Sequence, residues 1–177
     1  MIGQRPNPLG VEQFEFIEFA APDASRLHEL FKALGFTAVA HHRDHPISLY
    51  RQGGIQFLVN ETSDSHASRF AEKHGPACVG FALRVSDPAK SLQTLIAKGA
   101  ETLDQTAGLP SLDLPCIRGI GGSALYLTSG VADLERDFDF QPGAQRNPAG
   151  AGLYFIDHLT HNVQNGQMGR WASFYEN

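Results

Sequence analysis

The sequence predicts an α+β fold in which a strand–helix–three-strand (βαβββ) unit occurs twice and forms an open, curved sheet. The first observation is a pattern that appears twice: an apolar strand, an acidic residue, an amphipathic helix and a glycine, at the same spacing in both copies. The second is that short apolar runs, broken by Gly and Pro, follow each helix. The third is a Gly- and Pro-rich stretch, residues 141–152, which interrupts the pattern and indicates a linker.

The first unit covers about residues 12–62 and begins with the apolar strand "FEFIEFA". Asp23 is suited to cap the helix that follows, and Gly35 is suited to end it in a left-handed conformation. Three short runs, "TAVAHHR", "ISLYRQ" and "IQFLVN", are predicted as the remaining strands. The helix carries apolar residues at helical spacing, which we expect to face the sheet: Leu27, Leu30, Phe31 and Leu34.

The second unit covers about residues 77–130 and repeats these features in "CVGFALRVSDPAKSLQTLIAKGAE". Asp87 precedes a proline at the first helical position, and Gly99 follows the helix. The strands predicted after it are "ETLDQT", "LPCIRGI" and "SALYLTS", and "SDSHASRFAEKHG" between the units is predicted as a helical connector. The helix residues expected to face inward are Leu92, Leu95 and Ile96.

The pattern starts a third time in residues 153–177. "LYFIDHLTHNV" is predicted as a strand, and "GQMGRWASFYEN" as the start of a helix with Met168, Trp171 and Tyr175 on one face. A unit without its own three strands does not bury such a face by itself. We therefore expect self-association through residues 153–177, that is, a homo-oligomer.

Composition excludes several classes of function. The net charge is −5, and the Lys and Arg residues are scattered, so neither nucleic acid nor an anionic membrane surface is an expected partner. The apolar runs are shorter than a membrane span, and the first residues lack the order of a signal peptide. Cys78 and Cys116 have no spacing typical of a metal site or a redox pair, which indicates reduced thiols and a cytoplasmic protein.

Several stretches together resemble a known family: "NPLGVEQFEFIEFAAPD", "LYRQGGIQFLVN", "FAEKHGP", "IRGIGGSALYL" and "RNPAGAGLYFIDHLTHNV". The repeated unit resembles the vicinal oxygen chelate fold, the fold of glyoxalases and bleomycin-resistance proteins. The amino-acid sequence of these stretches is similar to that of bacterial 4-hydroxyphenylpyruvate dioxygenases, and the similarity extends from Asn7 to the last residue.

The resemblance implies an Fe(II)-dependent enzyme of tyrosine catabolism that converts 4-hydroxyphenylpyruvate and O2 to homogentisate and CO2. Such enzymes have two tandem barrels, of which the second is catalytic and holds iron by two histidines and a glutamate. Residues 1–152 then correspond to the non-catalytic N-terminal barrel with its linker, and residues 153–177 to the opening strand and partial helix of a truncated catalytic domain. We expect the chain alone to be inactive and to hold no iron stably; hydroxymandelate as the product, in place of homogentisate, stays open.

One residue matches the family's metal site. His158, in "FIDHL", corresponds to the first iron ligand, while no catalytic or cofactor-binding residue is assigned to this chain. If the strand is regular, Asp157 and His161 face away from His158, so they do not complete a triad with it. The resemblance also gives the first barrel no ligands of its own. It places Phe19, Gly80 and Tyr126 where ligands would be.

Two alternatives compete with this interpretation. The cluster "HHRDH" at residues 41–45 is either a polar turn or a surface site for Zn or Ni. The whole chain is alternatively a stand-alone, metal-free module that binds a small molecule or assembles with a partner. In that case five aromatic side chains line a cleft, whereas otherwise they are core: Phe16, Tyr50, Phe57, Phe81 and Tyr126.

Overall fold

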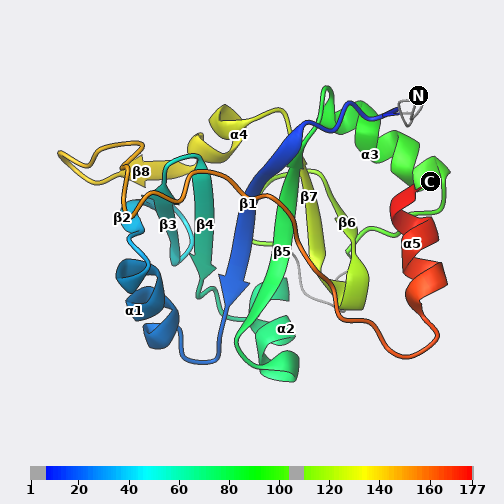
Figure 1. The fold of residues 1–177 in the computed structure, drawn as a ribbon, viewed down its shortest axis with the longest axis horizontal. Coiled ribbons are helices and arrows are strands. Elements are labelled where there is room, and N and C mark those ends of the chain that lie inside the picture. Colours follow the sequence, from blue (N-terminus) through cyan, green and yellow to red (C-terminus); the bar gives the residue numbers. More distant parts are fainter. Residues whose placement is uncertain (1–6, 104–109, 177) are drawn as a thin grey trace.

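The computed structural model describes residues 7–103 and 110–176, which form a single eight-stranded sheet with helices around it (Figure 1). The strands are β1 (Gln13–Ala20), β2 (Thr37–His42), β3 (Ile47–Gln52), β4 (Ile55–Asn60), β5 (Ala77–Arg84), β6 (Cys116–Arg118), β7 (Ala124–Thr128) and β8 (Phe138–Phe140). The helices are α1 (Ser25–Ala33), α2 (His66–His74), α3 (Pro88–Ala97), α4 (Val131–Glu135) and α5 (Met168–Glu176), with a 3-10 turn at Ile120–Gly122.

The strand order is β6-β7-β5-β1-β4-β3-β2-β8. Within the described residues no ladder joins β6 to β8, so the sheet is an open barrel. The predicted fold class, α+β with an open sheet of repeated units, is confirmed.

The first repeat has every predicted element. β1 pairs with β4 in parallel, and β2, β3 and β4 form an antiparallel meander. Gly35 follows α1 with a φ of 90°, the left-handed conformation expected after a helix. Asp23 lies one position before the helix cap, and its Oδ1 accepts the Ser25 amide hydrogen bond at 3.0 Å.

The second repeat has the same strand relationship, because β5 pairs with β7 in parallel as β1 does with β4. Asp87 caps α3 by accepting from the Lys90 amide, and Pro88 begins the helix. The predicted helical connector is α2. The prediction of a strand in "ETLDQT" is wrong for residues 101–103, which are not in a strand, although the Glu101 carbonyl accepts from the Arg118 amide of β6 at 2.7 Å. Residues 104–106 of that run lie outside the described residues.

Two elements after β7 were not predicted: α4 and β8. β8 pairs antiparallel with β2, so a segment that follows the second repeat extends the far edge of the first. Residues 141–152, which follow β8, contain no helix or strand.

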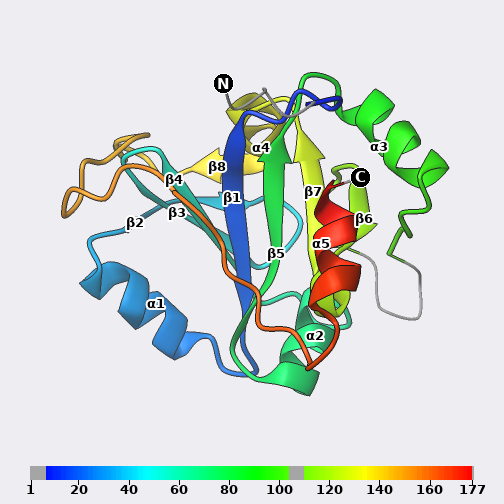
Figure 2. The ribbon, with the colours of Figure 1, turned by 45° about the vertical axis from the view of Figure 1, so that its right-hand side comes forward.

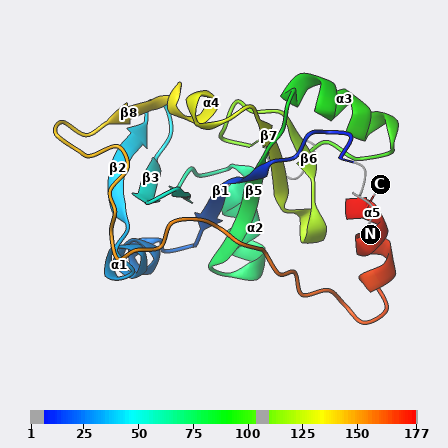
Figure 3. The same cartoon turned by 45° about the horizontal axis from the view of Figure 1, so that its top comes forward.

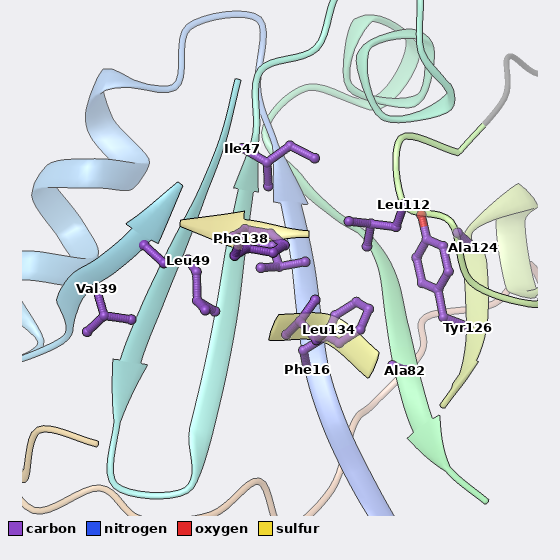
Figure 4. Close-up of a cluster of buried hydrophobic side chains, with 12 residues drawn as sticks. Phe16, Val39, Ile47, Leu49, Ala82, Leu112, Ala124, Tyr126, Leu134 and Phe138 are labelled. Atoms are coloured by element: carbon purple, nitrogen blue, oxygen red, sulfur yellow. The ribbon is translucent and has the colours of Figure 1, made fainter. Parts of the chain in front are cut away.

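The two repeats meet where β1 and β5 pair antiparallel, with Ile17 opposite Phe81 and Glu18 opposite Gly80. The inner face of the sheet carries the main apolar core. Figure 4 shows Phe16 of β1, Leu49 of β3 and Tyr126 of β7 on this face, together with Leu134 of α4 and Phe138 of β8. The core members are Phe16, Val39, Ala40, Ile47, Leu49, Leu58, Ala82, Leu112, Ala124, Tyr126, Leu134 and Phe138.

The outer face is covered by α1 over the first repeat and α3 over the second (Figures 1 and 2). Phe31 is the buried residue of α1, and its ring packs against Phe19, Phe36, Tyr50 and Phe57. The expectation that Leu30, Leu34 and Ile96 face the sheet is wrong. They are 50%, 43% and 46% exposed, because the helices touch the curved sheet through a narrower stripe than the full apolar face.

α5 lies on the same outer side, in front of β6 and β7 (Figure 2). Phe174 and Tyr175 line a cavity of about 180 Å³ beneath it, together with residues of β7 and α3. None of the helices in residues 7–103 and 110–176 is long and apolar enough to cross a membrane.

The close contact of β5 with β7 at Gly80 gives a test of this packing. A Cβ atom at Gly80 would lie 2.8 Å from the Ala124 carbonyl oxygen and 2.9 Å from the Ala124 Cβ. Gly80→Ala is expected to lower the free energy of unfolding by about 1–3 kcal/mol through overpacking, measured by urea denaturation.

Gly169→Ala is the matched control, because a Cβ there meets nothing within 4 Å and the position is helical. This variant is expected to be neutral or to gain up to about 1 kcal/mol of stability. Equal stability of the two variants would show that β5 and β7 are not in contact at Gly80.

Candidate functional site

The stretch "LYFIDHLTHNV" is not a strand in the structure. Residues 153–163 run extended across the outer face of the sheet, from the β3–β4 turn toward α5 (Figures 1 and 3). The Gly54 amide donates to the Tyr154 carbonyl at 2.9 Å, and Ile156 packs between the outer clusters of both repeats. The prediction was wrong because a strand needs a neighbouring strand to complete its hydrogen bonds, and this segment lies over the face of the sheet instead of along an edge.

His158 and Asp157 therefore do not alternate between two faces. Both side chains extend into solvent, 72% and 75% exposed, and Nδ1 of His158 lies 2.7 Å from Oδ2 of Asp157. The separation predicted from strand alternation is thus corrected: the two side chains form one exposed pair.

His161 lies apart from that pair in a different environment. Its ring stacks on Tyr175 at 5.9 Å with an interplanar angle of 9°, and it also packs against Phe81. Partial burial lowers the pKa of His161. A catalytic iron centre needs three protein donors at one point, and the described residues contain no group of three His, Cys, Asp or Glu side chains so arranged. The residues present do not fit a complete iron site.

The three positions that the resemblance equates with ligands have different surroundings. Phe19 points to the outer face, where its ring packs at 5.1 Å from both Phe31 and Phe57. Gly80 lies under the Tyr126 ring, since a Cβ there would be 3.1 Å from Tyr126 Cε2. The inner-face carboxylate next to Phe19 is Glu18, which the sequence analysis did not single out.

Glu18 is the centre of a buried polar cluster on the inner face. It is 1% exposed; its Oε1 accepts from Asn60 Nδ2 at 2.6 Å, and its Oε2 accepts from the Tyr126 hydroxyl at 2.9 Å. Burial raises the pKa of Glu18, while the two hydrogen bonds and the nearby His66 oppose this shift. Burial and the adjacent Glu18 also raise the pKa of Tyr126. The sequence did carry a signal for this cluster: a glutamate at an inward position of an otherwise apolar strand.

A second polar cluster surrounds Arg51 on the same face. The guanidinium is 2% exposed; it donates to Gln56 Oε1 at 2.6 Å and to Glu135 Oε1 at 2.6 Å. Gln56 donates in turn to Glu15, whose other oxygen accepts from Arg84 at 2.7 Å. The cluster thus links β1, β3, β4 and β5 to α4 by two ion pairs and the hydrogen bonds of Gln56 between them.

The cluster "HHRDH" forms a turn and not a metal site. β2 ends at His42, whose Nδ1 accepts from the Asp44 amide, and the His42 ring packs between His45 and Phe138. His41 contacts Ser48 and Gln141. Burial and the neighbouring His45 lower the pKa of His42. These side chains are committed to local contacts, in agreement with a polar turn.

The five aromatic residues proposed to line a cleft lie in separate clusters. Phe16 and Tyr126 pack together in the inner core, Tyr50 belongs to the outer cluster under α1, and Phe81 to the one under α3. They do not enclose a common cavity.

The two cysteines are free thiols. Burial raises the pKa of Cys78 to about 11, and burial likewise raises the pKa of Cys116. Neither thiol is therefore activated as a nucleophile.

Comparison with known proteins identifies the fold and its relatives. The family profile described as "Hydroxyphenylpyruvate dioxygenase, HPPD, N-terminal" matches residues 6–141. The 4-hydroxyphenylpyruvate dioxygenase of Pseudomonas sp. (strain P.J. 874) is 46% identical over 96% of this chain and 49% of the relative. That of Pseudomonas aeruginosa PAO1 is 40% identical over 98% of this chain and 50% of the relative.

A solved structure gives the same result. A "xylose isomerase-like TIM barrel/4-hydroxyphenylpyruvate dioxygenase fusion protein" superposes with a TM-score of 0.84 at 31% identity, over 98% of this chain and 28% of that one. The chain spans about half the length of the curated relatives it matches.

The buried Glu18 makes stability depend on pH in a defined direction. Its pKa in the folded chain is raised above the ordinary value of 4.5, so the folded state binds this proton more tightly than the unfolded state does. The contribution is fully present below that ordinary value and is lost as the pH rises through the folded pKa. Glu18→Gln keeps the shape and stays neutral, so its stability relative to the native chain is expected to increase from acidic to neutral pH.

The measurement is urea denaturation of both proteins across this range. Glu29→Gln, an exposed position on α1, serves as the control and is expected to show a constant difference from the native chain. If the stability difference between Glu18→Gln and the native chain stays constant or falls as the pH rises, ionisation of Glu18 does not destabilise the folded chain.

Proposed function

Since the chain belongs to the family of hydroxyphenylpyruvate dioxygenase N-terminal domains, we propose that it forms the non-catalytic half of an Fe(II)-dependent dioxygenase. The enzyme as a whole converts 4-hydroxyphenylpyruvate and O2 to homogentisate and CO2 in tyrosine catabolism. The observation that carries this proposal is the 46% identity to the Pseudomonas sp. dioxygenase over 96% of the chain. The two free cysteines support a cytoplasmic location.

We assign residues 1–152 to the non-catalytic barrel and linker, and residues 153–177 to the start of the catalytic domain. The inner face supports a scaffold role for the first part. There, Glu18 accepts hydrogen bonds from Asn60 and Tyr126, and Arg51 donates to Gln56 and Glu135. A buried polar group that already has its partners is not available to a ligand without losing those hydrogen bonds.

His158 is proposed as the first iron ligand of the complete enzyme. Its exposed imidazole is free of the core, and Asp157 contacts the ring at Nδ1, which leaves Nε2 for a metal. A carboxylate on one ring nitrogen fixes the tautomer and raises the basicity of the other, as is common at metal sites. The other donors would come from a second barrel, because the described residues near His158 do not supply them.

The purified chain alone is expected to form no homogentisate and to consume no oxygen with 4-hydroxyphenylpyruvate and Fe(II). A chimera in which this chain replaces the aligned half of the Pseudomonas sp. relative is expected to be active. In that chimera, His158→Ala should reduce turnover by more than about 100-fold, since changes in outer-shell partners alone cost roughly 10–100-fold.

Product chromatography and oxygen uptake are the measurements, with His45→Ala in the surface turn as the control that keeps activity. Homogentisate made by the isolated chain would contradict the division of labour. Full activity of the His158→Ala chimera would refute the ligand assignment. If the active chimera formed hydroxymandelate, the reaction would be the alternative one that the sequence leaves open.

The chain is also proposed to self-associate through residues 153–177. Tyr154, Phe155 and Met168 are 69%, 54% and 68% exposed, and the rings of Tyr154 and Phe155 pack side by side with centroids 4.9 Å apart. Replacing Tyr154 and Phe155 by Ser is expected to shift the chain toward the monomer in light scattering, because two exposed aromatic anchors are lost.

The matched control is the double change of Leu30 and Leu34 to Ser on α1, which removes a similar exposed apolar surface elsewhere. It should leave the oligomeric state unchanged. An assembly that survives the Tyr154/Phe155 change but is lost with the control would place the contact on α1.

A further inference from the structure

The cavity of about 180 Å³ on the outer side of the second repeat lies between α3, α5 and the outer face of β6 and β7 (Figure 2). Its floor contains Ile117 of β6 and Leu125 and Leu127 of β7, which are 1%, 3% and 1% exposed. Leu95 of α3 and Phe174 of α5 line it from the helices. The lining is therefore mostly aliphatic, on a floor that belongs to the buried core.

The repeat shows which residues occupy this space in the other half of the chain. In both repeats the aspartate before the helix lies twelve positions before the glycine that follows the helix, so the two helices align without a gap. In this alignment Phe31 of α1 corresponds to Leu95 of α3. Phe19 of β1 corresponds in the same way to Leu83 of β5.

The strand ladders extend this correspondence to the other strands. At the same position of the two parallel pairs, β1 lies beside Phe57 of β4, and β5 lies beside Leu125 of β7. Tyr50 of β3 is opposite Phe57, and Ile117 of β6 is opposite Leu125. Tyr50 and Phe57 of the first repeat therefore correspond to Ile117 and Leu125 of the second.

The first repeat fills these positions with aromatic rings. The Phe31 ring lies 5.1 Å from the rings of Phe19 and Phe57 and 5.7 Å from that of Tyr50. In the second repeat the four equivalent residues are aliphatic, and all of them line the cavity: Leu83, Leu95, Ile117 and Leu125. An aliphatic side chain fills less volume than an aromatic ring, and a packed interior leaves few voids. The cavity thus lies where the first repeat has its aromatic cluster.

The polar groups around the cavity already have other partners or contact water. The Asn7 side chain donates to the Val11 carbonyl at 2.9 Å and accepts from the Val11 amide at 2.8 Å. Lys98 also has an interaction partner in the chain, and Glu176 is exposed to solvent. A charged ligand placed against the aliphatic floor would lose its hydration without compensation. The lining therefore favours an uncharged ligand.

We propose that this cavity binds a small, uncharged aromatic molecule, whose ring takes the place of the aromatic side chains of the first repeat. An apolar cavity of about 150 Å³ lined by Leu, Ile and Phe side chains stays dry and binds benzene. Phe174 offers its ring for an edge-to-face contact with the ligand. None of the residues Met168–Glu176 of α5 is buried, so a small movement of this helix admits the ligand. The site is separate from the proposed iron centre and does not depend on it.

The test uses the full chain and three probes, toluene, benzoate and cyclohexane, each titrated while amide NMR shifts are recorded. Toluene is expected to bind saturably, with the largest shifts in β6, β7, α3 and α5. Leu95→Phe gives the second repeat the residue of the first. It is expected to weaken toluene binding at least tenfold and to raise the melting temperature of the free chain, because the new ring fills the cavity.

Ile96→Phe is the matched control, since it adds a ring at the next position of the same helix. That side chain is 46% exposed, and it is not part of the cavity lining. The dissociation constant of toluene should stay unchanged in this variant. Equal weakening in both variants, unchanged binding in Leu95→Phe, or no saturable binding of toluene would overturn the site. Benzoate binding as tightly as toluene would overturn the preference for an uncharged ligand, and cyclohexane binding as tightly would overturn the preference for an aromatic one.

Discussion

The antiparallel pairing of β1 with β5 is the contact on which the rest of the structure depends. It joins two repeats, each with a parallel pair of its own, into one sheet. It also sets Glu18 opposite Gly80, and the absence of a side chain at Gly80 lets the Tyr126 ring lie over this position and reach the Glu18 carboxylate. The contact at Gly80 therefore determines both the spacing of β1, β5 and β7 and the buried hydrogen bond from Tyr126 to Glu18.

The Arg51 cluster holds β8 in place at the open edge of the sheet. β8 has only three residues, and so short a strand does not hold its place by ladder bonds alone. Arg51 contacts Glu135 at the end of α4, and both Arg51 and Arg146 lie over the Phe140 ring of β8. A buried ion pair adds little net stability, but it defines one arrangement of this segment, because any other would leave Arg51 without the Glu135 carboxylate.

Local signals in the sequence were enough to predict most of the fold, and non-local contacts explain what was missed. Alternation, the Asp87 cap and the terminal glycines act within a few residues, so seven of the eight strands and the helices α1, α2, α3 and α5 were expected where they occur. α4 and β8 depend on Arg51, far away in the sequence. Residues 153–163 have the alternation of a strand, but alternation does not supply a neighbour. The Glu18 cluster was not predicted because its partners Asn60 and Tyr126 lie 42 and 108 residues away in the sequence.

The hydrogen bonding and exposure of the polar side chains indicate which of them are available to a ligand. On the inner face, Glu18, Tyr126 and Arg51 are each bonded to partners within the chain, so this face contributes order instead of reactivity. The Asp157–His158 pair is exposed and has a ring nitrogen available. A ligand must reach a group that has an atom available to it; His158 offers such an atom at the surface of the fold, and the core serves to position it.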